Sequence, residues 1–419
     1  MRRLRLGVRP GGIGTDTVWA LGVETLTLAV GVLSFALLGS GLGAAGYGDY
    51  VAIFAVTGTI GTVATSGTGL AVMHHALREQ ADVTVVARSL LTFGTAAGCV
   101  LGLVAVPIVL LVVDSVGVVT AAAFVGAELV AAPMIWVASD LVRVRVGFGP
   151  ASRMKMLLPL SRALLLVSLA ASGLLRLEVL GPTMFVLTIA VGVILLATSA
   201  RIVGFTAGRG RVVGAHARSA TLYAVGLSAL AFQNDGDKAV MSASVPPAEA
   251  GRYAAAYRIV QFGLLPMGSL LASSHQRFLR HDDGVAGQHL ARTIRYSAVA
   301  CAYGVVFAIA TATAAPLLAG VLGDDYADAE WTIRLLAPLV LARSVSLFAL
   351  NGLLGLGRTG VRTALLVGGA ALAMILYLAL IPRFATTGAV TATLVSETIV
   401  ALVAWMLLVS FQRREDAPS

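Results

Sequence analysis

The residues of this sequence that are most able to do chemistry are ionisable side chains inside long apolar stretches. Charged groups in apolar segments are costly, and they usually face a packed interior or an aqueous cavity. Ten residues meet this description: Glu24, Glu128, Arg162, Asp235, Asp237, Lys238, Arg258, Arg334, Arg343 and Glu397. Such residues can form ion pairs, couple to a cation or hold a charged ligand.

The densest group of these charges is the run QNDGDK, residues 233–238. Asp235 and Lys238 are three residues apart and would share one face of a helix, whereas Asp237 would point elsewhere. Arg258 follows in the next apolar stretch, near the same membrane side. These four residues are the predicted gate or coupling group. We expect Asp237 and Arg258 to pair and close an external gate, slightly in preference to direct substrate binding.

Three further arginines are the predicted cations of a substrate cavity. Arg162, Arg334 and Arg343 each lie in an apolar stretch, and each is expected to lack a carboxylate partner. The alternative for each is a side chain that extends to the membrane surface from near a helix end. Glu24 is a fourth cavity candidate because it lies in the first apolar stretch.

The composition places these residues in a membrane protein. Charged residues make up 12% of the 419 residues and hydrophobic residues 58%, against roughly 25% charged in average soluble domains. A single hydrophobic core stops growing near about 250–300 residues, so the remaining apolar surface must face lipid. The net charge of +9 is spread singly between apolar runs, a pattern that argues against nucleic-acid binding.

The apolar runs predict about twelve transmembrane helices, each near the roughly 20 residues that a bilayer crossing needs. The predicted spans are 17–42, 50–73, 89–113, 116–141, 156–175, 179–204, 219–243, 253–275, 296–320, 331–354, 363–382 and 387–411. The fold class is therefore an all-α polytopic membrane protein.

The basic residues orient these spans. Cytoplasmic loops are rich in Lys and Arg, and with a cytoplasmic N-terminus 22 basic residues lie inside and three outside. The other five of the 30 lie within spans. Both termini are therefore predicted to be cytoplasmic, and the acidic segment 324–330 external.

A short internal repeat predicts two halves. GDYVA at 48–52 opens the second span and GRYAA at 251–255 opens the eighth. With six spans in each half, both copies enter the membrane from the same side, so the repeat is parallel and the substrate path lies between the halves. The predicted domains are six-helix bundles at 1–211 and 212–419.

No constellation in the sequence predicts catalysis, a metal site or a cofactor. The six histidines lie at or near the cytoplasmic boundary, and the adjacent pair His74 and His75 is expected to form an interfacial turn. GLGAAG at 41–46 matches a dinucleotide-binding pattern, but it ends a predicted membrane helix and lacks the required strand. We expect its glycines to stop that helix and form a tight turn.

Several motifs resemble the polysaccharide-transporter, O-antigen flippase branch of the multidrug/oligosaccharidyl-lipid/polysaccharide (MOP) exporter superfamily. LGAAGYGDY at 42–50 is similar to the branch's turn after helix one, LG-x-x-GYG-x-Y. DK at 237–238 followed by GRYAAAYR at 251–258 resembles its segment across helices seven and eight. The others are LGDDY at 322–326 with LAP at 336–338, GLGR at 355–358, and IPRFATTGAV at 381–390, which resembles IP-x-x-G-x-x-GAA.

The resemblance implies two six-helix bundles around a V-shaped central cavity and alternating access. It implies a flippase in the prokaryotic plasma membrane that moves a lipid-linked oligosaccharide, of undecaprenyl-pyrophosphate type, for cell-surface polysaccharide assembly. Implied partners are membrane lipids, H⁺ or Na⁺ as coupling ion, and polysaccharide polymerases or glycosyltransferases. A cation-coupled small-molecule exporter of the same superfamily is the main alternative. A membrane-embedded glycan polymerase or ligase is a remote one, because the external segments are short and acidic.

Overall fold

The computed structural model describes residues 13–79, 81–205, 210–267, 288–320 and 323–415. Within these residues every regular element is a helix. In this described part of the chain, eight helical stretches are long and apolar enough to cross a membrane. The all-α, multi-pass membrane fold expected from the sequence is thus confirmed, whereas the count of twelve spans and the side of the termini stay predictions.

Two of the membrane-crossing stretches are long enough for two crossings. Helix α1 (Ile13–Gly61) has non-helical backbone at Gly43, with φ 68° and ψ 177°. Helix α14 (Thr359–Glu415) has a similar break at Ala385, with φ 46° and ψ −128°. Each break lies between two predicted spans. The glycine motif at 41–46 therefore ends a helix and turns the chain, as expected, because glycine adopts a positive φ at little steric cost.

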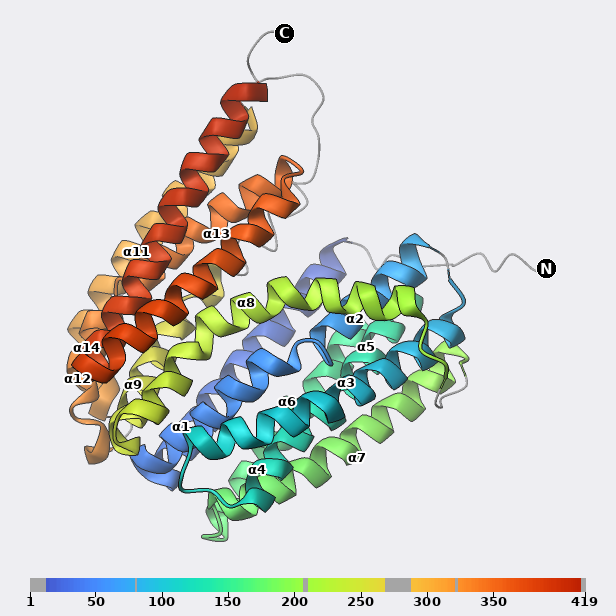
Figure 1. Cartoon of the computed structure of the whole chain (residues 1–419), viewed down its shortest axis with the longest axis horizontal. Helices are drawn as coiled ribbons and strands as arrows, with labels where there is room; N and C mark the ends of the chain where they lie inside the picture. The colour runs from blue at the N-terminus through green and yellow to red at the C-terminus, as the bar shows by residue number, and fades with distance from the viewer. Residues whose placement is uncertain (1–12, 80, 206–209, 268–287, 321–322, 416–419) are drawn as a thin grey trace. The chain divides into compact units, whose positions relative to one another are not determined.

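The contacts divide the chain into two compact units, residues 1–231 and 232–419. The first contains, besides α1, the following elements: α2 (Ser66–Met73), η1 (His74–Arg78), α3 (Val83–Val112), α4 (Val118–Val125), η2 (Gly126–Ala131), α5 (Ala132–Arg145), α6 (Phe148–Ala171) and α7 (Leu177–Val203). Helix α5 packs against α7, α6 and α3, and these helices lie side by side in Figure 1.

The second unit begins inside α8 (Gly214–Ser244). It continues through α9 (Pro247–Phe262), α11 (Gln288–Gly320), η3 (Asp324–Tyr326), α12 (Ala329–Leu336), α13 (Leu339–Gly355) and α14. Helix α13 packs against both α11 and α14. The division falls at 231/232, inside a continuous helix. The predicted boundary at 211/212 lies just before that helix, and the two six-helix bundles stay a prediction.

A glycine face on α3 shows how helices pack in the first unit. Gly94, Gly98 and Gly102 repeat every fourth residue and are buried. A Cβ atom on Gly98 would overlap the backbone oxygen of Leu129 in η2. Leu103, beside this face, is 77% exposed and suits a lipid-facing position. Small residues let membrane helices approach closely where no hydrophobic effect drives them together.

Candidate functional site

A buried arginine connects three helices of residues 232–419. The Nε atom of Arg343 on α13 donates to Glu397 Oε1 on α14 at 2.9 Å. Its Nη1 donates to Asn234 Oδ1 at 2.6 Å and its Nη2 to the Gln233 carbonyl oxygen at 2.9 Å, both on α8. Arg343 is 8% exposed and Glu397 is 7% exposed. The guanidinium therefore has a charged partner and two neutral acceptors, as a buried cation requires.

The lysine of the QNDGDK run holds a second polar group on α8. Lys238 Nζ lies 3.0 Å from Asp237 Oδ1 and 3.3 Å from Asp235 Oδ1, and it donates to the Asn234 carbonyl oxygen at 2.5 Å. Tyr253 donates its hydroxyl to the other oxygen of Asp237, also at 2.5 Å. Asp237 is fully buried, whereas the side chain of Asp235 is 40% exposed.

The prediction of an ion pair between Asp237 and Arg258 is wrong. Arg258 is exposed on α9, where it donates to Gln261 at 3.1 Å. The partners of Asp237 are Lys238 and Tyr253. The same turn of α8 supplies the cation, so Asp237 needs no charge from the next helix. The expected closeness of Asp235 and Lys238 is confirmed by their ion pair.

The three predicted cavity arginines all have carboxylate partners, contrary to expectation. Arg162 Nη2 lies 2.5 Å from Glu128 Oε1, and Arg343 is paired with Glu397 as described above. Arg334 Nη2 lies 2.7 Å from Glu330 Oε1, one helical turn earlier. A charge left unpaired in a low-dielectric interior is costly, and helix packing supplies two of these partners across long sequence distances. The side chain of Glu24 lies outside the described residues.

A pocket of about 250 Å³ with three charged side chains in its lining lies within residues 1–231, and it was not predicted from the sequence. Its lining residues are Ser66, Leu70, Met73, Trp136, Asp140, Arg143, Lys155 and Leu227. Lys155 Nζ lies 2.8 Å from Asp140 Oδ1 and 4.5 Å from the centre of the Trp136 ring. The pocket thus combines two cations, one carboxylate and an indole. Arg143 and Lys155 lie between the predicted spans 116–141 and 156–175, in a gap that the predicted topology puts in the cytoplasm, a signal that could have indicated this end of the unit.

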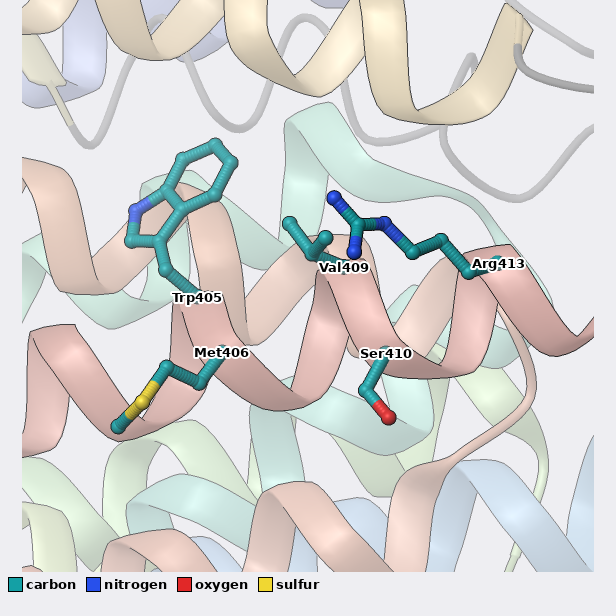
Figure 2. Close-up of a pocket in the computed structure, with 5 residues that line it drawn as sticks. All are labelled: Trp405, Met406, Val409, Ser410 and Arg413. Carbon is teal, nitrogen blue, oxygen red and sulfur yellow. The ribbon is translucent and has the colours of Figure 1, made fainter.

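A second, largely apolar pocket of about 620 Å³ lies along the last turns of α14. Figure 2 shows Trp405, Val409 and Arg413 on one side of the helix, with Met406 and Ser410 beside them. Trp405 donates its Nε1–H to the Val345 carbonyl oxygen at 3.2 Å. Arg413 places a positive charge at the end of an otherwise apolar surface, an arrangement that suits an amphipathic molecule.

The histidine pair at the end of α2 forms a polar cluster instead of a simple turn. His75 Nδ1 lies 2.7 Å from Glu79 Oε2, and His74 Nε2 lies 3.3 Å from Glu79 Oε1. Glu79 was not among the predicted site residues, although its spacing of four from His75 is readable in the sequence. The hydrogen bond from His75 holds the pKa of the Glu79 carboxyl below its usual range.

Helix α8 covers this histidine cluster from the other side. Ser219 contacts His75 Nε2 at 3.1 Å, and the Tyr223 hydroxyl contacts His74 Nδ1 at 2.9 Å. The ring of His216 lies 4.3 Å from that of His75, centre to centre. Burial, followed by repulsion from His75, lowers the pKa of His216.

Comparison with known proteins places this geometry in a known fold. No protein-family model matches the chain, and no curated protein matches it. Among solved structures, an inward-facing MATE-family multidrug resistance transporter of the MOP superfamily aligns with a TM-score of 0.67 at 13% identity, covering 96% of this chain and 100% of that one. A MOP superfamily transporter from Pyrococcus furiosus aligns at 0.60 and 14% identity, over 96% and 95% of the two chains.

A third solved structure, a MATE multidrug transporter in complex with a bound compound, aligns with a TM-score of 0.62 at 14% identity over 94% of each chain. The three likenesses extend over nearly the whole chain. This multi-pass membrane protein therefore has the fold of the MATE transporters of the MOP superfamily.

Proposed function

We propose that this protein is an alternating-access transporter of the prokaryotic plasma membrane. Its proposed substrate is a lipid-linked oligosaccharide, which it moves outward for cell-surface polysaccharide assembly. Transport is supported by the MATE-like fold over nearly the whole chain. The glycan substrate is supported by the family motifs of the sequence and, above all, by the pocket of residues 1–231 with its charged side chains.

That pocket has chemistry that suits a pyrophosphate-linked sugar. Lys155 and Arg143 outnumber the single carboxylate of Asp140 among its lining residues, so the pocket favours an anion. Charge-assisted hydrogen bonds from Lys and Arg are the strongest that a phosphate receives. Trp136 offers a broad apolar face on which a sugar ring can pack. The predicted topology puts this pocket at the cytoplasmic side, where a lipid-linked precursor is made.

In this proposal the group formed by Asp235, Asp237 and Lys238 on α8 couples transport to an ion. Asp235 is its most accessible carboxylate, and Lys238 already neutralises part of its charge. An incoming H⁺ or Na⁺ would compete with Lys238 for Asp235 and so weaken the contacts of Lys238 on α8. The glycosyltransferases that assemble the substrate and the polymerase that consumes it are the proposed partners.

Deletion of the gene and complementation with variants test the substrate. Deletion should leave the undecaprenyl-linked oligosaccharide on the cytoplasmic leaflet and remove a surface polymer. Wild type should clear the oligosaccharide from the cytoplasmic leaflet and restore the surface polymer. The double variant Lys155→Ala, Arg143→Gln should do neither at equal protein abundance. Arg201→Gln is the matched control, because Arg201 is an exposed basic residue in the last turn of α7, outside the pocket.

A small-molecule exporter is the second candidate, favoured by the fold shared with the MATE multidrug transporter solved with a bound compound. In that case deletion would leave surface glycan unchanged and raise sensitivity to cationic dyes. Neutralising Asp235 would then abolish dye resistance, whereas the Lys155 and Arg143 variants would retain it. This combination of results would replace the glycan proposal.

A further inference from the structure

The histidine cluster at the end of α2 has the donor set of a transition-metal site. His74, His75 and Glu79 offer two imidazole nitrogens and one carboxylate, and their ligand atoms all lie within 4.8 Å of one another. Zinc binds such atoms at about 2.0–2.2 Å, which puts neighbouring ligands of a tetrahedral ion about 3.3 Å apart. Glu79 Oε1 lies 3.3 Å from His74 Nε2, which matches this spacing, and Glu79 Oε2 lies 2.7 Å from His75 Nδ1, which is shorter.

The backbone explains why two adjacent histidines can both reach Glu79. Residues 74–78 form the π-helical turn η1, and the Glu79 amide donates to the His74 carbonyl oxygen at 3.4 Å, five residues back. A π-turn brings residues four and five apart to about the same face, whereas an α-helix would separate them. Single π-turns of this kind occur frequently at functional sites.

The second nitrogen of each histidine is fixed by a hydroxyl from α8. His74 uses Nε2 toward Glu79 and Nδ1 toward Tyr223, and His75 uses Nδ1 toward Glu79 and Nε2 toward Ser219. Metal-ligating histidines nearly always have such an outer hydrogen bond, which fixes the tautomer and the ring orientation. Both rings are thus held with one nitrogen turned to the same carboxylate.

A further imidazole, that of His216, lies beside the cluster. His216 is 6% exposed, and its Nδ1 has no hydrogen-bond partner among the described residues. A buried polar atom without a partner is uncommon and calls for an explanation, such as an ion. Its ring packs against that of His75, so His216 borders the cluster.

We propose that His74, His75 and Glu79 bind one zinc-class divalent transition-metal ion, with His216 as an adjoining third imidazole. The site goes beyond the proposed transport function and does not depend on it. Because α8 supplies both supporting hydroxyls and His216, a bound ion would brace the end of α2 against α8. Glu79, whose side chain is 52% exposed, gives the ion access from solvent.

Zinc binding to the full-length protein tests this inference. The protein would be purified in detergent, its affinity tag removed and its metal stripped with a chelator. Zn²⁺ would then be titrated in competition with a chromogenic chelator. The expected result is one Zn²⁺ per chain and a rise in thermal melting temperature, because an ion that binds only the folded state stabilises it. Mg²⁺ should not compete, since it prefers all-oxygen ligands.

Variants separate this site from unspecific binding. Glu79→Gln and His75→Ala should each weaken zinc binding at least tenfold, and Ser219→Ala about tenfold through loss of ring orientation. Glu178→Gln, at another exposed glutamate, is the matched control and should bind as wild type does. Absence of zinc uptake by the wild type would overturn the proposal. Undiminished affinity in a His75→Ala, Glu79→Gln double variant would do the same by placing the ion elsewhere.

Discussion

Removing Glu397 tests how strongly the buried arginine depends on its carboxylate. The variant Glu397→Ala leaves the charge of Arg343, 8% exposed, with only the neutral acceptors Asn234 and Gln233. Breaking a buried ion pair on one side costs about 3–5 kcal/mol, because the remaining charge is uncompensated. At about 2–4 °C per kcal/mol, we expect the apparent melting temperature to fall by on the order of 10 °C.

A double variant separates the contribution of the ion pair to stability from that of the surrounding residues. Replacing both partners by apolar residues, as in Arg343→Met with Glu397→Leu, removes both buried charges together and is often neutral. The double variant should therefore melt above either single variant, so that the two losses are strongly non-additive. Heating purified protein in detergent, followed by size-exclusion chromatography, compares wild type, Arg343→Met, Glu397→Leu and the double variant at one heating rate.

A matched arginine provides the control for this prediction. Arg258 is exposed and donates to Gln261 on its own helix, so Arg258→Gln should change stability by less than about 0.5 kcal/mol. A melting temperature of Glu397→Ala within about 2 °C of wild type, where a fall of about 10 °C is expected, would refute the dependence on the carboxylate. A double variant that loses the sum of the two single losses would refute it as well.

Three further predictions follow from the backbone and the charge pattern. Ala385→Gly should raise stability by about 1 kcal/mol, because it relieves about 1–3 kcal/mol of backbone strain and costs about 0.5–1 kcal/mol of chain entropy; a lower melting temperature would contradict this. Gly98→Ala should lower stability by about 1–3 kcal/mol, since its Cβ atom would overlap the Leu129 backbone; an unchanged melting temperature would count against the close packing of α3. A cysteine at Asp325 should react with an impermeant maleimide in intact cells, whereas labelling of one at Ala417 instead would reverse the predicted topology.

The helices could be predicted from the sequence because membrane crossing is a property of long stretches. Each predicted span lies mostly on described helical residues, and residues 268–275 of the eighth lie outside the described part of the chain. The turn at Gly43 was also predictable, because its glycines interrupt an apolar run. Hydropathy averages over about 20 residues, so single errors in boundaries do not change the result.

The partners of some of the charged residues were harder to predict. Arg162 meets Glu128 across 34 residues and Arg343 meets Glu397 across 54, and no local spacing reveals contacts that depend on how helices rotate and pack. Arg334 and Glu330, in contrast, are only four residues apart, so their pairing can be predicted from the sequence. Ala385 occupies the glycine position of the IP-x-x-G motif that its segment resembles, so the motif could have indicated the break in the helix there.

The glycine face of α3 also decides where probes can be attached to this protein. A spin label or fluorophore at Gly94 or Gly98 would have to force two backbones apart, so its signal would report a damaged molecule. Leu103 and Leu111, 77% and 81% exposed on the same helix, can carry such a label without touching the glycine face. Distances measured from these two positions would follow any movement of an intact α3.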